Sequence, residues 1–246
     1  MTESTRNPNK IFSRDIYPTI YHLPGSRFSN LKDRRIDASE MEKFITNPDH
    51  GDVIIITEKL DGSSTGVAKL DGKIIAVIRK GYLCEHSKHL QHRVFAQWVK
   101  KREVLFDKLL NEGEYVCGEW LIQAHGTIYI LTNRSPFVVF DLFSNGKRIP
   151  YAHLREKCAY VGLTMVPILY WNTDPIPVNL AMEKLGEFGH YGAIEPAEGA
   201  VWRRENNGEC YPVLAKYVRP VKEPGKYLED QTKKLPIWNV ALEDLL

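Results

Sequence analysis

One lysine of this sequence stands where a nucleophile would be expected. Val53–Leu60 (VIIITEKL) is a largely apolar run, fit for a buried strand, and Lys59 lies near its end, followed at once by Asp61 and Gly62. A lysine held at the rim of a core is partly desolvated, which lowers its pKa and frees its lone pair for attack. The glycine would let a phosphate or a sugar approach the backbone closely. A surface lysine before an ordinary hairpin turn would have the same neighbours, so the segment Glu58–Ser63 alone leaves both interpretations open.

Further short motifs follow this lysine along the chain. They are, in order, Arg79-Lys80-Gly81, Gly118-Glu119, Phe137-Val138-Val139-Phe140-Asp141, Glu198-Gly199-Ala200-Val201 and Leu214-Ala215-Lys216. Together with the Lys-x-Asp-Gly segment, the series resembles the motifs of the covalent nucleotidyltransferase superfamily, which comprises DNA ligases, RNA ligases and messenger-RNA capping enzymes. Each motif is short, and the specificity comes from their order. The resemblance extends from Glu58 to Arg219, about two-thirds of the chain.

Within this superfamily the sequence is most similar to the ATP-dependent RNA ligases. Tyr17–Arg27 (YPTIYHLPGSR) and Glu58–Ala68 (EKLDGSSTGVA) resemble the start of small bacterial and phage members. The sequence departs from the superfamily at two points. Residues 220–246 are too few for the oligonucleotide-binding barrel that follows the last motif in DNA ligases and capping enzymes, so we expect no such barrel. The last motif often has two lysines spaced Lys-x-Lys, whereas here the position two residues after Lys216 is Val218.

The resemblance implies a reaction in three steps. Lys59 attacks the α-phosphate of ATP and releases pyrophosphate, AMP passes to the 5′-phosphate of an RNA end, and a 3′-hydroxyl then displaces AMP. ATP with Mg²⁺ or Mn²⁺ is therefore the expected cofactor set, and RNA ends, free or at a nick in a duplex, are the expected partners. Such phosphoryl transfer depends on positioning and charge neutralisation, which carboxylates holding a metal and basic side chains would supply.

The same resemblance assigns roles to individual residues. Glu119 and Glu198 would hold the metal and help to bind the nucleotide, Lys216 would contact the α-phosphate, and Arg79 the ribose or the acceptor phosphate. The other expected nucleotide contacts are Glu58 at the adenine amino group, through its side chain or backbone, Asp61, Gly62, and Phe140 stacked on adenine, with Phe137 as its rival. Asp141 is either part of its motif or a hydrogen-bonding residue after a strand. For each charged residue, a solvated surface position is the alternative.

The elements that must hold these residues indicate a mixed fold. Asp71-Gly72 between two strand patterns is a strong hairpin signal. Further strand patterns cover residues 115–121, 128–131, 137–143, 198–204 and 212–219, and helical patterns cover 38–46, 85–110, 151–163 and 179–188. Clustered strands with helices between them predict an α+β fold with antiparallel sheets flanked by helices. The resemblance identifies this fold as a nucleotidyltransferase domain, the ATP-grasp-like adenylation domain of ligases.

Length and composition fit one such domain. The chain has 246 residues, of which 43% are apolar, and we expect a single nucleotidyltransferase domain over 1–246, with 1–50 as an N-terminal extension. A net charge of +2 excludes a broadly basic surface, so any nucleic-acid contact must be a local patch. The four cysteines form no CxxC pair, which argues against a zinc site. Without a signal segment or a long apolar run, we expect a soluble cytoplasmic protein with no membrane partner. The sequence carries no signal for the oligomeric state.

Histidines open the helical pattern that follows Tyr82. His86, His89 and His92 could imitate the spacing of a metal site, but the three do not share one helical face. We therefore expect a solvated basic face here, or part of a nucleic-acid groove.

Other functions compete with the RNA-ligase interpretation. The closest are a minimal DNA ligase and a nucleotidyltransferase that adenylates ends without sealing them. A capping enzyme that uses GTP is disfavoured because the chain stops where its second domain would begin. A nucleic-acid-binding module with a degenerate ligase fold would be free to lose its reactive side chains, yet Lys59, Glu119, Glu198 and Lys216 are all present.

Overall fold

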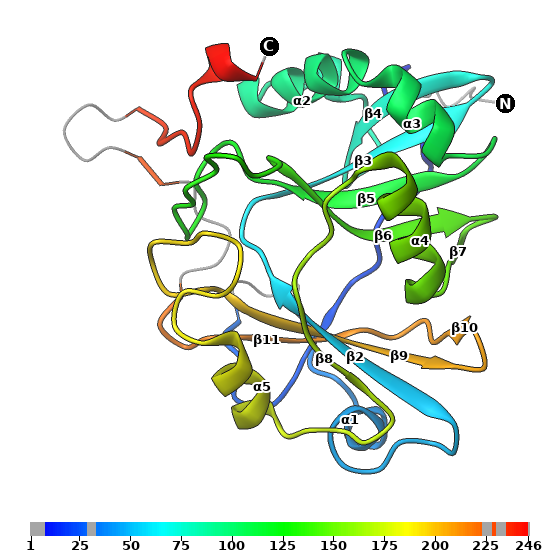
Figure 1. The fold of residues 1–246 in the computed structure, drawn as a ribbon, viewed down its shortest axis with the longest axis vertical. Helices are drawn as coiled ribbons and strands as arrows, with labels where there is room; N and C mark the ends of the chain where they lie inside the picture. The colour runs from blue at the N-terminus through cyan, green and yellow to red at the C-terminus, as the bar shows by residue number, and fades with distance from the viewer. Residues whose placement is uncertain (1–7, 29–32, 223–227, 230–234, 246) are drawn as a thin grey trace, which may run out of the picture.

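Two β-sheets, stacked with helices on their outer sides, make up the fold (Figure 1). The structure is a computed structural model, and it describes residues 8–28, 33–222, 228–229 and 235–245. One sheet, here called the β2 sheet, has the strand order β1-β11-β9-β2-β8, with β10 paired to β9. The other, the β3 sheet, has the order β4-β3-β5-β6-β7. An α+β fold was predicted, and it is confirmed.

The β2 sheet brings together strands that are far apart in sequence. Its members are β1 (Tyr21–His22), β2 (Asp52–Lys59), β8 (Ile168–Asn172), β9 (Gly199–Asn206), β10 (Glu209–Cys210) and β11 (Ala215–Val218). β2 pairs with β9 along its whole length, from Asp52 opposite Asn206 to Lys59 opposite Gly199. The pairs are antiparallel except for β1 and β11, which run parallel. The apolar run of β2 therefore occupies a position between two neighbouring strands, where both edges of its backbone are hydrogen-bonded.

The β3 sheet is antiparallel throughout. It contains β3 (Ser63–Leu70), β4 (Lys73–Ile78), β5 (Tyr115–Trp120), β6 (Phe137–Ser144) and β7 (Lys147–Arg148). The predicted hairpin is confirmed, because Leu70 faces Lys73 and only Asp71 and Gly72 lie between them. Both turn residues have positive φ, 50° and 71°. This is the backbone that a two-residue hairpin loop with the strands' own twist requires.

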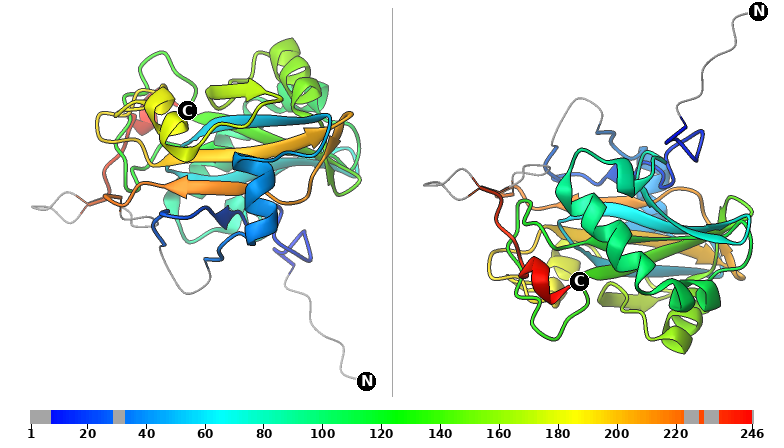
Figure 2. Two further views of the ribbon diagram at one scale, coloured as in Figure 1. Left: turned by 90° about the horizontal axis from the view of Figure 1, so that it is seen from below. Right: turned by 90° about the horizontal axis from the view of Figure 1, so that it is seen from above.

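Helices cover the outer side of each sheet (Figure 2). The helices are α1 (Ala38–Ile45), α2 (Leu90–Lys100), α3 (Glu103–Leu109), α4 (Tyr151–Val161) and α5 (Val178–Leu185), with 3-10 turns at Cys84–His86 and Leu242–Asp244. Seen from below, α1 and α5 lie against the β2 sheet, and seen from above, α2 and α3 cross the β3 sheet. α1 begins where the Asp37 side chain accepts a hydrogen bond from the backbone N–H of Ser39, and α4 ends at Gly162 with φ 75°. In the described part of the chain, no helix is both long enough and apolar enough to span a bilayer.

Apolar side chains fill both outer faces and the space between the sheets. The aromatic rings of α2 and α3 pack on Trp120 and Phe137 of the β3 sheet, and Phe44 of α1 packs on Trp202 of the β2 sheet. Between the sheets, residues 12–20 of the N-terminal segment pack on the inner face of β3, β5 and β6. The two sheets are therefore joined by a shared core. Of the expected N-terminal extension, residues 21–22 form β1 and 38–45 form α1, while residues 1–7 and 29–32 lie outside the described ranges.

Two predicted elements were wrong in part. The helical pattern over 85–110 is broken into a 3-10 turn and two helices, because the chain bends at Arg102 so that Phe106 reaches the same core as Trp98. The strand expected at 128–131 is absent, and only one bridge, from Tyr129 to Ala193, forms there. The backbone N–H groups of Ile128 and Tyr129 donate to side chains of Glu195 and Asn239 instead of to a strand. β8 was not predicted.

Candidate active site

Lys59 lies at the point where the chain crosses from one sheet to the other. β2 ends at this lysine, β3 begins at Ser63, and the segment 60–62 links the β2 sheet to the β3 sheet. The Lys59 ammonium donates a hydrogen bond of 2.6 Å to Oε2 of Glu198, which immediately precedes β9. The side chain of Lys59 is 22% exposed and that of Glu198 only 3%. The ammonium is thus held by Glu198, while part of the Lys59 side chain remains exposed to solvent.

Two more carboxylates complete the surroundings of this lysine. The backbone N–H of Gly62 donates to Oε1 of Glu119 at 3.1 Å, and Asp61 is buried beside Lys59. The backbone N–H of Asp61 donates to the Tyr129 hydroxyl at 2.9 Å. The turn after the lysine is therefore fixed from both sides, by a carboxylate of β5 and by a tyrosine of the following loop.

Packing explains the glycine of this turn. A Cβ at Gly62 would lie 2.6 Å from the carbonyl oxygen of Trp120 and 2.8 Å from a methyl group of Leu121. The backbone of β5 thus comes too close for any side chain at this position. The sequence led us to expect a close approach by a phosphate or a sugar, whereas the close approach seen in the structure is made by the chain itself.

The expected depression of the Lys59 pKa was wrong. Burial lowers the pKa of Lys59, but the carboxylates of Glu198, Glu119 and Asp61 outweigh it, and the net shift is upward. Burial, together with the neighbouring carboxylates, raises the pKa of Glu119 to about 8 and that of Asp61 to about 7. The raised pKa values mean that burial and mutual repulsion oppose the ionised forms of Glu119 and Asp61. A further cation bound beside them would favour those ionised forms.

The raised pKa of Glu119 predicts that Glu119→Gln stabilises the fold in alkaline solution. An acid whose folded pKa lies above its unfolded pKa binds more protons in the native state, so stability falls as pH rises from about 4.5 to about 8. Glutamine has a similar size and no charge. At pH 8 we expect the unfolding temperature of the variant to be several degrees higher than that of wild type, which corresponds to a free energy of unfolding larger by about 1 kcal/mol or more. Near pH 4 the two proteins should differ little. Thermal unfolding at both pH values measures this, and an equal or lower midpoint at pH 8 would contradict it.

Lys216 has the depressed pKa that was expected for Lys59. Burial and then the charge of Lys59 lower the pKa of Lys216 to about 8. Lys216 lies on β11, opposite His22 of β1, and its Nζ is 3.9 Å from the Asp33 carboxylate. The His22 ring is stacked on Phe28 and shares a hydrogen bond of 2.7 Å with the Ser26 hydroxyl. The N-terminal segment thus forms one wall around Lys216. Tyr17–Arg27 was noted in the sequence only for its resemblance to the family, and none of these residues was predicted to belong to the site.

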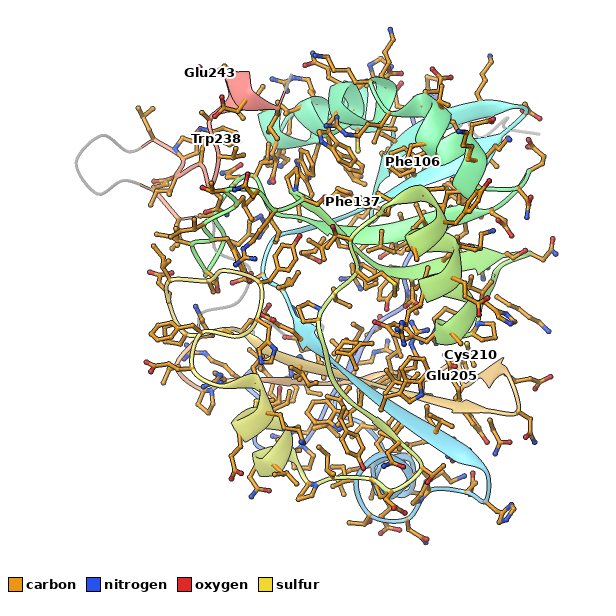
Figure 3. The ribbon with its side chains drawn as sticks, viewed as in Figure 1. Phe106, Phe137, Glu205, Cys210, Trp238 and Glu243 are labelled. Atoms are coloured by element: carbon orange, nitrogen blue, oxygen red, sulfur yellow. The ribbon has the colours of Figure 1, made fainter. Side chains whose placement is uncertain are left out.

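The other predicted nucleotide contacts differ in their surroundings. Arg79 follows β4, is exposed, and donates a bond of 3.4 Å to the carbonyl of Pro18. Phe140 is half-buried and packs edge-on against Tyr17, with ring centroids 4.7 Å apart. Phe137 is fully buried under the helices, 5.1 Å from the Phe95 ring, and in Figure 3 it lies in the helix-covered core together with Phe106. A core ring of this kind has no free face for a base, so the structure favours Phe140 over Phe137.

Glu58 projects a buried carboxylate into the loop that follows α5. Its Oε2 accepts a hydrogen bond of 2.8 Å from the backbone N–H of His190, and burial raises the pKa of Glu58. Its Oε1 is buried and has no hydrogen-bond partner among the described residues. This oxygen is therefore a buried acceptor that no described residue satisfies.

Asp141 and His92 have structural partners. The Asp141 carboxylate is fully buried, pairs with Arg203 across the two sheets, and accepts a bond of 2.6 Å from the Tyr17 hydroxyl. His92 is also buried, with its ring nitrogens 2.8 Å from the hydroxyls of Ser63 and Ser87. The expectation of a solvated face at the three histidines was therefore wrong for His92, because its ring ties the lysine turn to the start of α2.

The carboxylates of the site are suitable ligands for a hard divalent cation, but they are too few to hold one by themselves. Oxygen donors of Glu119 and Glu198 are the kind that Mg²⁺ and Mn²⁺ prefer. Among the residues that the structure describes, no group of three or more His, Cys, Asp or Glu is arranged to hold a metal by itself. Mg²⁺ commonly takes one or two protein carboxylates and completes its shell with phosphate oxygens and water. The residues present fit a metal that enters with a nucleotide.

Comparison with solved structures shows the fold. A mutant of the Naegleria gruberi RNA ligase with ATP and Mn matches with a TM-score of 0.51 and 16% identity, covering 69% of this chain and 50% of that one. Another mutant of the same ligase, with AMP and Mn, matches with a TM-score of 0.53 and 19% identity, covering 86% of this chain and 61% of that one. The same ligase with pyrophosphate matches with a TM-score of 0.53 and 16% identity, covering 87% of this chain and 60% of that one. The chain therefore spans half to about three-fifths of the length of these structures. At these identities the likeness establishes the fold alone.

Comparison with family models goes further. No curated protein sequence matches the chain significantly. The model of the family described as RNA ligase matches residues 52–218, a range that begins at β2, ends with β11 and contains Lys59, Glu119, Glu198 and Lys216. This range is about two-thirds of the chain and includes every strand of the two sheets except β1. The chain belongs to the RNA ligase family.

Proposed function

We propose that this protein is an ATP-dependent RNA ligase that joins a 5′-phosphate end to a 3′-hydroxyl end through a covalent lysyl-AMP on Lys59. The observation that carries the proposal is the ammonium of Lys59, held 2.6 Å from Glu198 at the end of β2 with Glu119 and Asp61 beside it. A nucleophile in a fixed position, surrounded by groups that manage phosphate charge, is what in-line phosphoryl transfer requires.

Two side chains, Lys216 and Arg79, would direct the α-phosphate to Lys59. Lys216 is near enough to Lys59 for their charges to interact, so a phosphate between the two ammonium groups would be attracted by both. Arg79 also lies within electrostatic reach of Lys216, from the end of β4. Its planar guanidinium suits a phosphate oxygen pair or a ribose. In this arrangement Lys59 must lose its proton before it attacks, and the raised pKa of Lys59 shows that the carboxylates oppose that loss.

A divalent metal bound by Glu119 and Glu198 would offset this effect. When bound, it supplies positive charge that neutralises the carboxylates and the phosphate oxygens. The Naegleria gruberi ligase mutants with ATP or AMP contain Mn, which supports Mn²⁺ or Mg²⁺ as the metal here. Glu119 and Glu198 would then release their hold on the lysine turn and on Lys59.

The free oxygen of Glu58 supports adenine as the base. Oε1 of Glu58 is a buried acceptor without a partner among the described residues, and it can accept a hydrogen bond from the exocyclic amino group of adenine. Guanine presents a carbonyl oxygen at the equivalent ring position, and two acceptors facing each other would leave both unsatisfied. Phe140, half-buried between the sheets, would stack on the ring. ATP is therefore preferred to GTP in this proposal.

Ribose at the 3′-hydroxyl side decides between the RNA ligase and its closest alternatives. A net charge of +2 gives no broad basic surface for duplex binding, so selectivity should depend on groups at the reacting ends, where the 2′-hydroxyl distinguishes RNA from DNA. We expect about tenfold faster sealing, or more, with a ribonucleotide than with a deoxyribonucleotide at the terminal 3′-hydroxyl, and rates that fall as salt rises.

Matched 5′-phosphate substrates that differ only at this terminal nucleotide, with ATP and Mg²⁺ or Mn²⁺, provide the measurement. Equal rates on both substrates would favour a minimal DNA ligase. Adenylated 5′ ends that accumulate without joining would identify an end-adenylating nucleotidyltransferase. Binding of RNA with no uptake of AMP would leave only the binding module.

A further inference from the structure

The last motif of this chain supplies one lysine where two are common, and the structure shows why its neighbour cannot help. Lys216 and Val218 lie two residues apart on β11 and share one side of the strand. Val218 is 1% exposed, faces Gly199 on β9 and is part of the buried core. Arg219, the next basic residue, donates to the carbonyl of Gly186 and lines a groove beside α5 on the outer side of the β2 sheet. Its charge is therefore directed away from Lys59.

A lysine farther along the chain returns to the site. After β11 the chain turns, with the backbone N–H of Lys222 donating to the carbonyl of Arg219 at 3.1 Å. The Lys222 residue is 6% exposed, and its ammonium donates to the carbonyl of Gly126 at 2.7 Å and to the Thr127 hydroxyl at 2.8 Å. Thr127 is fully buried and donates in turn to Oδ2 of Asp61 at 3.3 Å. A continuous chain of hydrogen bonds thus joins Lys222 to the turn that carries the nucleophile.

The way Lys222 is buried distinguishes it from an ordinary structural lysine. Both of its acceptors are neutral oxygens, and no carboxylate of the described residues lies within ion-pair distance of its ammonium. Burying an ammonium without a direct counter-ion is energetically unfavourable. What offsets that cost is the wider field of Asp61, Glu195 and Glu198, which opposes the lowering of the Lys222 pKa by burial. The ammonium is placed to act on the carboxylates of the site rather than on a single partner.

We propose that Lys222 is a positioning residue of the adenylation step: its ammonium orients the Thr127 hydroxyl against the Asp61 carboxylate, and it supplies the second positive charge that the last motif lacks. The inference rests on the proposed transfer of AMP to Lys59. Asp61 lies two residues after that lysine, so an Asp61 side chain that moves would move the turn and misalign Lys59 for in-line attack. Lys222, whose charge acts on Asp61 and Glu198, lies outside residues 52–218, the range matched by the RNA ligase family model.

Four variants test this chain of hydrogen bonds. Lys222→Met removes the ammonium but keeps an unbranched apolar side chain, and Thr127→Val removes the hydroxyl but keeps the branched shape. In single-turnover experiments with labelled ATP, we expect each to lower the maximal rate of lysyl-AMP formation by about tenfold or more, with the KM for ATP changed by less than about threefold. The double variant should be no slower than the slower single one, because both changes break the same chain. Thr127→Ser retains the hydroxyl and should react at the wild-type rate.

The pattern of rates separates this role from a contribution to folding. A residue that only stabilises the fold would lower the unfolding temperature and leave the rate of the folded fraction unchanged. Maximal rates within twofold of wild type for Lys222→Met or for Thr127→Val, or multiplicative losses in the double variant, would overturn the proposal. If Lys222→Met does not fold, the pair Thr127→Val and Thr127→Ser decides the question alone. A wild-type protein that takes up no AMP would instead refute the proposed function itself.

Discussion

Lys59→Arg will lower the rate at which the protein takes up AMP covalently by about a thousandfold or more. Arginine keeps the positive charge and can keep the ion pair with Glu198, so the site should stay assembled. A guanidinium does not lose its proton in proteins and offers no lone pair to the α-phosphate. A thousandfold loss corresponds to about 4 kcal/mol of barrier. Incubation with α-labelled ATP and Mg²⁺ or Mn²⁺, followed by denaturing electrophoresis, measures the label that remains on the protein.

The bond in the labelled wild-type protein provides an independent check. A lysine that attacks phosphorus leaves a phosphoramidate, so the label should be lost in acid, persist in base and map to Lys59. Lys73→Ala is the matched control, because Lys73 is an exposed lysine on β4 of the same fold and should label normally. Normal labelling of Lys59→Arg would show that another residue is the nucleophile.

Glu198→Gln should lower the rate of lysyl-AMP formation by about tenfold or more while the protein stays folded. The change removes a charge that holds the Lys59 ammonium at 2.6 Å and that would help to bind the metal, and it keeps the volume of the side chain. It therefore opens no cavity in the core. A titration of metal at fixed ATP should show that the variant needs a higher concentration of Mg²⁺ or Mn²⁺, because one carboxylate ligand is lost.

Glu187→Gln is the control for this experiment, since Glu187 is an exposed glutamate eleven residues earlier in the sequence and lines the groove beside α5. Both its rate and its metal dependence should equal those of wild type. A Glu198→Gln variant with wild-type turnover and an unchanged metal requirement would exclude Glu198 from the chemistry.

Local sequence patterns predicted the strands that carry the site. The apolar run of β2 and the Asp71-Gly72 turn are each short, local patterns of fewer than ten residues, and the strand and the hairpin both formed as predicted. The side chains of Lys59, Glu119 and Glu198 lie together because β2 pairs with β9 and β3 pairs with β5. The hydrophobic periodicity of a sequence does not reveal which strands pair with each other. The order of the motifs indicated it only through resemblance to a family whose members share the arrangement.

The rest of the site depends on distant contacts that no local pattern shows. Thr127 precedes the predicted strand 128–131 and Tyr129 lies within it, yet both hydroxyls are hydrogen-bonded to Asp61, more than sixty residues earlier. Lys222 is one of many lysines in the sequence, and only the turn after β11 brings it to the same place. The pKa of Lys59 was mispredicted for a related reason. The sequence indicated burial, but two of the three carboxylates that outweigh burial, Glu119 and Glu198, come from segments far along the chain.

The pairing of β2 with β9 has a consequence for the newly made protein. Lys59 lies opposite Gly199, so 139 residues separate the nucleophile from Glu198, and Lys216 and Lys222 leave the ribosome later still. A nascent chain that has emerged as far as α5 contains Lys59, Glu119 and β8, which pairs with one edge of β2, but it lacks β9, which pairs with the other edge. At about 5–20 residues per second, roughly 7 to 28 seconds pass between the synthesis of Lys59 and that of Glu198. Until β9 and β11 enter the sheet, Lys59 therefore lacks both Glu198 and Lys216, and we expect the chain to acquire its chemistry only at that stage.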